Sequence, residues 1–127
     1  MIRATPAILR AEEAEEFPTE ERCHIRETWN RDDDEGLSIA RVRVCPGITT
    51  RLHRLRGIAE RYLILEGRGR VEVGELQPEV VTPGDLVYIP PGCTQRISNL
   101  GEGDLLFFAV CTPRYVPEAY EDMDPAE

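Results

Sequence analysis

The sequence contains no lysine, so all 15 of its basic residues are arginines, and they face 24 acidic residues. The formal net charge at pH 7 is −9. Nucleic-acid backbones and anionic membrane surfaces repel a chain of this charge, so neither is expected as a partner. A local pocket containing a few arginines remains compatible with this composition.

Long apolar runs are also missing. No stretch of 18 or more apolar residues occurs, so no membrane-spanning helix is expected, and segment 1–17 lacks the apolar stretch of a secretory signal. The four cysteines form no CxxC pair and match no zinc-ribbon spacing. They are Cys23, Cys45, Cys93 and Cys111. We therefore expect a cytoplasmic protein with reduced, buried thiols, although a disulfide between two of them is also compatible with the sequence.

A sustained 3.6-residue period is absent between residues 21 and 112, which argues against helices. Short segments rich in β-branched, aromatic or alternating residues occur instead, separated by turn sequences such as DDDEG, EGRG and PPG. The nine segments are 23–30, 37–44, 49–55, 60–66, 70–73, 79–81, 86–90, 94–99 and 105–112. Turns at intervals of about 8–12 residues predict an all-β sandwich or barrel.

Both ends of the chain are acidic. The stretch AEEAEEF near the N-terminus has the composition of one or two helical turns, and residues 115–127 are expected to lie on the surface or fray. A length of 127 residues fits one compact domain. The sequence thus predicts a single domain over 1–127, with a barrel core at about 21–112 between acidic N- and C-terminal extensions.

Two polar residues in the middle of the chain point to chemistry. Residues two apart on a strand share a face, so Arg51, His53 and Leu55 are expected to point the same way. Glu60 and Tyr62 would share a face on the returning strand. If this hairpin lines a barrel, His53 and Glu60 converge inside it. Such a pair is costly in an apolar interior unless it is satisfied, and a bound divalent cation is one way to satisfy it.

Two motifs in this region resemble those of the cupin superfamily. The first runs glycine, five residues, His-x-His, three or four residues, glutamate, six residues, glycine. Its matching residues are Gly47, His53, Glu60 and Gly67. The second runs glycine, five residues, Pro-x-Gly, two residues, histidine, three residues, asparagine. Its matching residues are Gly84, Pro90, Gly92 and Asn99. The chain is identified as a small single-domain cupin, and the resemblance implies a double-stranded β-helix, the cupin or jelly-roll barrel.

The resemblance also implies a metal site. In cupins, both histidines and the glutamate of the first motif bind one divalent metal together with the histidine of the second. Here Leu55 and Gln95 occupy two of the three histidine positions, so His53, Glu60 and Gln95 remain as candidate metal ligands. Gln95 can ligate through its carbonyl oxygen, which shifts preference toward Mn²⁺, Fe²⁺ or Mg²⁺.

The expected cofactor is one divalent ion (Mn, Fe, Ni or Zn). The alternative is a metal-free barrel in which the same three side chains hydrogen-bond to one another.

Other residues near the motifs are weaker candidates. Tyr62 is expected to handle protons together with Glu60, unless it is simply a core tyrosine. Arg51 is a candidate substrate-binding residue, because an arginine in a pocket clamps carboxylates or phosphates, but at the rim it would only be solvated. Cys93 could face the mouth of the pocket or be a small buried thiol. No face can be assigned to His24.

The asparagine that ends the second motif, Asn99, is expected to satisfy backbone groups near its turn.

The cupin resemblance spans many chemistries. We expect a metalloenzyme of isomerase, lyase or dioxygenase type that acts on a small polar or carboxylated substrate. A non-catalytic module, with or without a metal, that binds small molecules or another protein is the alternative. Because single-domain cupins commonly pair through their N-terminal strands, a homodimer is expected, with Trp29 in segment 23–30 as an anchor.

Overall fold

The computed structural model describes residues 5–125, and strands dominate it. The strands are β1 (Phe17–Pro18), β2 (His24–Trp29), β3 (Ser38–Val44), β4 (His53–Leu55), β5 (Ala59–Glu66), β6 (Gly69–Val73), β7 (Glu79–Val81), β8 (Leu86–Ile89), β9 (Gln95–Asn99), β10 (Leu105–Thr112) and β11 (Tyr120–Asp122). Two short 3₁₀ helices, η1 (Ala11–Glu13) and η2 (Pro117–Ala119), accompany them. Each of the nine predicted segments contains a strand, which confirms the all-β prediction.

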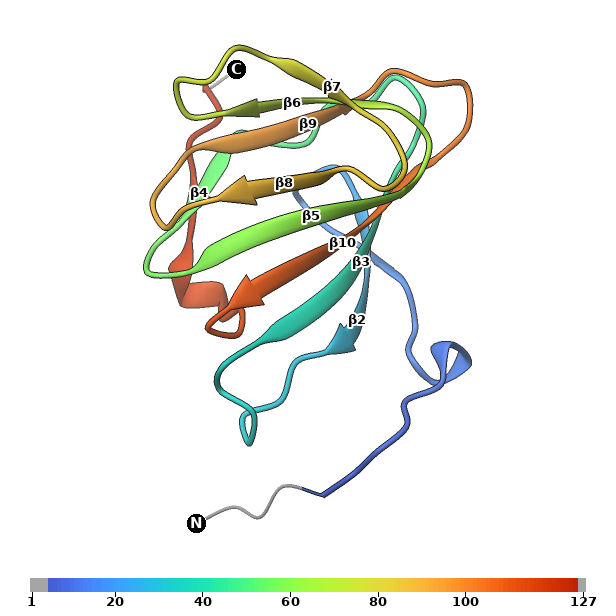
Figure 1. The fold of residues 1–127 in the computed structure, drawn as a ribbon, viewed down its shortest axis with the longest axis vertical. Helices are drawn as coiled ribbons and strands as arrows, with labels where there is room; N and C mark the ends of the chain where they lie inside the picture. Colours follow the sequence, from blue (N-terminus) through green and yellow to red (C-terminus); the bar gives the residue numbers. More distant parts are fainter. Residues whose placement is uncertain (1–4, 126–127) are drawn as a thin grey trace.

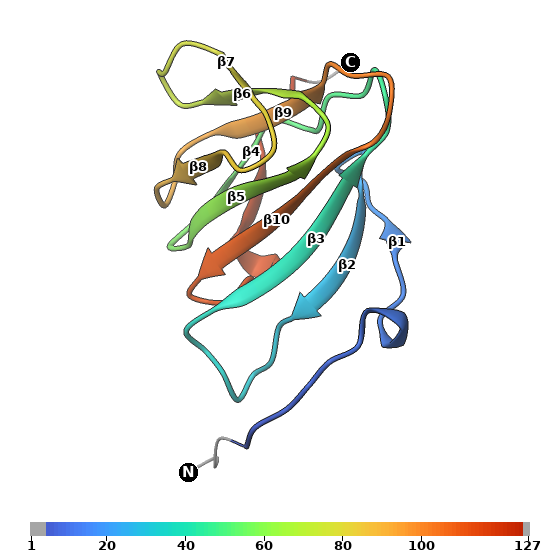
Figure 2. The ribbon, with the colours of Figure 1, turned by 45° about the vertical axis from the view of Figure 1, so that its right-hand side comes forward.

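The strands form two antiparallel sheets that face each other (Figures 1 and 2). One sheet has the order β1-β2-β3-β10-β5-β8, and the other has the order β11-β4-β9-β6-β7. Neighbours such as β4 and β9 come from distant parts of the sequence, as the double-stranded β-helix requires. The predicted cupin barrel is therefore confirmed.

The core follows from the alternation of apolar residues along the strands. On β5 and β10, alternate residues are buried, and the inward side chains of the two sheets meet between them. The most deeply buried apolar side chains are Phe107, Ile64, Ile89, Ile97, Leu105 and Val44. Burying side chains of this kind contributes about 1.5–3 kcal/mol each, so this apolar layer holds the sheets together.

Two motif residues fix the turns at one end of the barrel. Gly67 has a φ of +89°, and a Cβ at this position would lie 2.8 Å from a backbone oxygen of the adjacent chain segment, so no other residue fits. Asn99 donates from Nδ2 to the carbonyls of Val44 (2.9 Å) and Gly103 (2.8 Å), and its Oδ1 accepts the backbone N–H of Gly101 (2.8 Å). The predicted role of Asn99 in satisfying backbone groups is confirmed.

The C-terminal segment differs in part from its prediction. Strand β11 pairs with β4, with Tyr120 opposite Leu55, and Ala119 before it is buried. The Met123 N–H donates to the carbonyl of Leu52 at 2.8 Å. The segment does lie at the surface, as expected, but it does not fray between β11 and Met123, because ladder hydrogen bonds hold it against β4. Residues 126–127 lie outside the described residues.

The N-terminal prediction is confirmed in part. AEEAEEF contains a single helical turn, η1, and the exposed chain before it, residues 5–10, extends away from the barrel (Figures 1 and 2). Residues 1–4 lie outside the described residues. All four cysteines are free thiols, as expected, but only Cys23 and Cys111 are buried, whereas Cys45 and Cys93 are half-buried. Across residues 5–125, no helix is long and apolar enough to cross a membrane.

Candidate functional site

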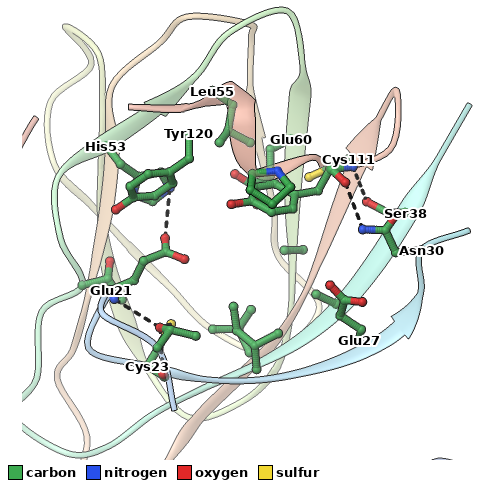
Figure 3. Close-up of a pocket in the computed structure, with 18 of the residues that line it drawn as sticks. Glu21, Cys23, Glu27, Asn30, Ser38, His53, Leu55, Glu60, Cys111 and Tyr120 are labelled. Atoms are coloured by element: carbon green, nitrogen blue, oxygen red, sulfur yellow. Dashed lines mark hydrogen bonds and ion pairs between the residues drawn. The ribbon is translucent and has the colours of Figure 1, made fainter. Parts of the chain in front are cut away.

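A pocket of about 720 Å³ opens between the two sheets and is closed on its sides by segments near both ends of the chain (Figure 3). The two-residue period of the strands supplies its inner wall: Glu60 and Tyr62 come from β5, and Phe107, Ala109 and Cys111 come from β10. Most of the wall is apolar, and the volume lies in the range of small-molecule sites.

His53 is fixed at this pocket by its neighbours. Its Nδ1 lies 2.9 Å from the backbone oxygen of Arg51, and because a carbonyl can only accept, Nδ1 carries the proton. The ring of Tyr120 stacks on the imidazole, with ring centres 5.1 Å apart. The Nε2 atom faces the carboxylate of Glu21, with Oε1 at 3.6 Å (Figure 3). The Nε2 atom of His53 therefore faces the pocket, where it can accept a proton or act as a metal ligand.

Glu60 is the most perturbed carboxyl group in the pocket. It is only 8% exposed, and this burial raises its pKa from 4.5 to about 7. The charge of His53 and a hydrogen bond from Gln95 act in the opposite direction, while the charge of Glu21 adds to the rise. The Oε1 atom of Glu60 has no hydrogen-bond partner among the described residues. Glu60 thus exchanges a proton near neutral pH and has one oxygen free to accept a hydrogen bond from a ligand.

Gln95 is oriented by Tyr62. The Tyr62 hydroxyl donates a short hydrogen bond to the Gln95 Oε1 atom, and Gln95 is almost completely buried, at 1% exposure. Burial raises the pKa of Tyr62 well above its usual value, so the hydroxyl keeps its proton. The phenol therefore positions the Gln95 amide beside Glu60. The predicted proton transfer by Tyr62 itself stays a prediction.

The predicted metal ligands lie together but offer few free donors. Gln95 stands directly opposite His53 in the β4–β9 pairing, and Glu60 interacts with both residues. The Gln95 carbonyl oxygen already accepts the Tyr62 hydroxyl, and Leu55 supplies no donor. Within residues 5–125, no group of three or more His, Cys, Asp or Glu side chains could hold a metal ion. As arranged, only His53 and Glu60 present free donor atoms, so these three residues would fit a divalent ion only with the Gln95 amide turned away from Tyr62.

Arg51 lies at the pocket with its charge already paired. Its guanidinium is 3.0 Å from a carboxylate oxygen of Asp122 and 3.6 Å from one of Asp124. The predicted role of Arg51 in binding an anionic substrate stays a prediction, and these two ion pairs count against it.

The two remaining candidates lie away from the pocket wall. Cys93 packs against the main core cluster, and a side chain on Gly74 would contact its sulfur. His24 lies on β2 outside the pocket lining, and its buried Nδ1 has no hydrogen-bond partner within residues 5–125.

Several pocket residues were missed from the sequence because they lie outside the two motifs. They are Glu21, Cys23, Cys111, Tyr115 and Tyr120. Tyr115 is held by its backbone, which accepts from the Asn30 side chain (3.0 Å) and donates to Ser38 (2.9 Å). Only the alternation along β10, which places Cys111 on the face of Phe107, gave a usable signal.

Burial raises the pKa of Cys23 to about 12 and also raises that of Cys111, so both thiols are neutral and poor nucleophiles.

The raised pKa of Glu60 predicts how the free energy of unfolding depends on pH. Because the folded state holds this proton more tightly than the unfolded chain, the stabilisation is complete below pH 4.5 and is lost as pH rises through about 7. Between pH 5 and pH 8, we expect the wild type to lose about 2–3 kcal/mol more unfolding free energy than Glu60→Gln. Urea unfolding at both pH values measures this difference. The exposed control Glu102→Gln should behave as the wild type, and an equal pH dependence of wild type and Glu60→Gln would contradict the assignment.

Comparison with known proteins places this geometry in a family. The Cupin domain family matches residues 40–111. The uncharacterized protein MJ1618 of Methanocaldococcus jannaschii is 34% identical over 113 residues, which is 87% of each chain. In fold, the chain is similar to KdgF from Halomonas sp. (TM-score 0.77, 18% identity, 87% of this chain and 96% of that one). It is also similar to Pac13, a nucleoside dehydratase from Streptomyces (TM-score 0.79, 15% identity, 97% and 95%). The chain belongs to the cupin superfamily.

Proposed function

We propose that this cupin is an enzyme of the isomerase or lyase type that moves protons on a small molecule bound in its pocket. The observation that carries the proposal is Glu60, a buried carboxyl group with a pKa of about 7 and an oxygen that no described residue contacts by a hydrogen bond. A group that titrates near neutral pH serves equally well as a proton donor and as a proton acceptor. Pac13, which has a similar fold, is a dehydratase, and removal of water is a reaction of this kind.

The neighbours of Glu60 would exchange a second proton and hold the Glu60 carboxyl group in position. His53 is held by the Arg51 carbonyl and the Tyr120 ring, and its Nε2 atom can take or return a second proton. Tyr62 and Gln95 hold the Glu60 carboxyl group in place through their linked hydrogen bonds. The apolar walls exclude water, which strengthens each of these electrostatic interactions.

Deuterium incorporation tests the proposal for a substrate of any structure. Chelator-treated protein would be incubated in D₂O with mixtures of small metabolites, and mass spectrometry would detect deuterium uptake or loss of water. We expect Glu60→Gln to lower the rate at least ~100-fold, which is the usual contribution of a general acid–base group. The matched control is Glu102→Gln, which removes an exposed carboxyl group outside the pocket. Wild-type turnover that survives Glu60→Gln would refute the assignment.

Divalent metal binding by His53, Glu60 and Gln95 is a second candidate function. The Oε1 atom of Glu60 and the Nε2 atom of His53 favour it, and Gln95 completes the set only if its amide turns away from Tyr62.

Metal content tests this candidate directly. If a metal binds, protein purified without added metal should carry about one equivalent of Mn, Fe, Ni or Zn. His53→Ala should remove it, while Tyr62→Phe should increase occupancy because it frees the Gln95 carbonyl. Less than about a tenth of an equivalent, with no thermal shift on adding these ions, rules the candidate out.

We also propose that the chain forms a homodimer through β2. Strand β1 pairs only with His24 and Ile25, so the part of β2 from Arg26 to Trp29 has no partner strand on that side among the described residues. An open edge of this kind is a template for a second copy. Light scattering is expected to give about twice the mass of one chain. A strictly monomeric protein over a wide concentration range would contradict this.

A further inference from the structure

We propose that the pocket binds small organic cations, with the positive group of the ligand placed between the carboxylates of Glu21 and Glu60. This inference rests on the proposed function, because it names the substrate class of the same site. It differs from the carboxylated substrate expected from the sequence, and the charges, contacts and walls of the pocket each support it.

The charges around the pocket favour a cation. Five acidic residues line it: Glu20, Glu21, Glu27, Glu60 and Asp122. Arg51 is the one arginine among the described lining residues, and its ion pairs with two aspartates neutralise it. An anionic ligand would therefore meet no free positive charge among these residues except the imidazole of His53. A cation would meet carboxylates in the interior and at the rim.

The two inner carboxyl groups share a single basic neighbour. Glu21 lies 3.6 Å from the His53 Nε2 atom, and Glu60 interacts electrostatically with both His53 and Glu21. One imidazole can pair with only one of two carboxyl groups, and no second unpaired basic side chain lines the described pocket. A ligand ammonium would supply a second positive charge, and it would also give Glu60 Oε1 the hydrogen-bond donor that it lacks.

The walls indicate that the cation is organic. Beside the acidic residues, the pocket is lined by aliphatic side chains and by the aromatic rings of Phe17, Tyr62, Phe107, Tyr115 and Tyr120. Apolar walls bury the hydrocarbon part of a ligand, and aromatic rings additionally attract positive charge at short range. A bare metal ion would leave most of the 720 Å³ unfilled.

The rim supports entry of a cation. Glu20 and Glu27 are exposed side chains at the pocket, and the whole chain carries a net charge of −9. Clefts lined by charges of one sign concentrate ligands of the opposite sign and raise their association rates.

Three probes of nearly the same shape test the inference: benzylammonium, benzyl alcohol and benzoate. Binding to chelator-treated, full-length protein would be measured by calorimetry at pH 8, where Glu60 is ionised. We expect benzylammonium to bind about tenfold more tightly than benzyl alcohol, the equivalent of one hydrogen bond to a charged group, and benzoate to bind more weakly than both.

Matched variants localise the effect. Glu21→Gln and Glu60→Gln should each lower benzylammonium affinity to the level of benzyl alcohol, while unchanged binding of the alcohol shows that the pocket is intact. Glu102→Gln should retain the full preference. The inference is overturned if benzoate or benzyl alcohol binds the wild type as tightly as benzylammonium, or if the preference for the amine survives in both pocket variants.

The two proposals fail in different ways. Retained amine preference with neither deuterium uptake nor loss of water would reject the acid–base function and leave the ligand class standing. Turnover that depends on Glu60 but acts on neutral or anionic compounds, without amine preference, would reject the ligand class alone.

Discussion

A carboxyl group buried beside an imidazole is the constraint on which this site depends. Glu60 is removed from water by the apolar strands around it, and this desolvation works against its charge. His53 and the Gln95 amide, which Tyr62 holds in place, compensate only part of this desolvation. What remains is an oxygen without a partner among the described residues, and a ligand can gain binding energy there that a fully satisfied core would not offer.

The replacement of motif histidines by Leu55 and Gln95 changes the character of the pocket. A histidine at either position would offer a basic nitrogen, whereas leucine contributes only packing and the Gln95 carbonyl is turned toward a phenol. The carboxyl groups of Glu60 and Glu21 thus share one imidazole as their unpaired basic neighbour within the described pocket. A cationic ligand or a metal ion would each supply the positive charge that these residues lack.

The sequence predicted the barrel well because its signals are local. Alternating strands and motif turns such as the one at Gly67 are readable from neighbouring residues. The two-residue period, combined with the expected hairpin, also predicted that His53 and Glu60 face the same pocket. Glu21 and Tyr120 could not be found in this way. Each reaches His53 through contacts between segments far apart in the sequence, and no local period reports such contacts. The paired state of Arg51 was invisible for the same reason.

The pocket walls supplied by the segments around Glu21 and β11 have a consequence for how such a protein can change. These walls lie outside both barrel motifs, but β11 is an edge strand of one sheet and pairs with β4, with Asp122 opposite His53, and the Tyr120 ring stacks on the same imidazole. A substitution in β11 that reshapes the space for a ligand therefore also acts on the position of His53. The shape of the pocket and the placement of its basic group are thus tied together, so the two are expected to change together.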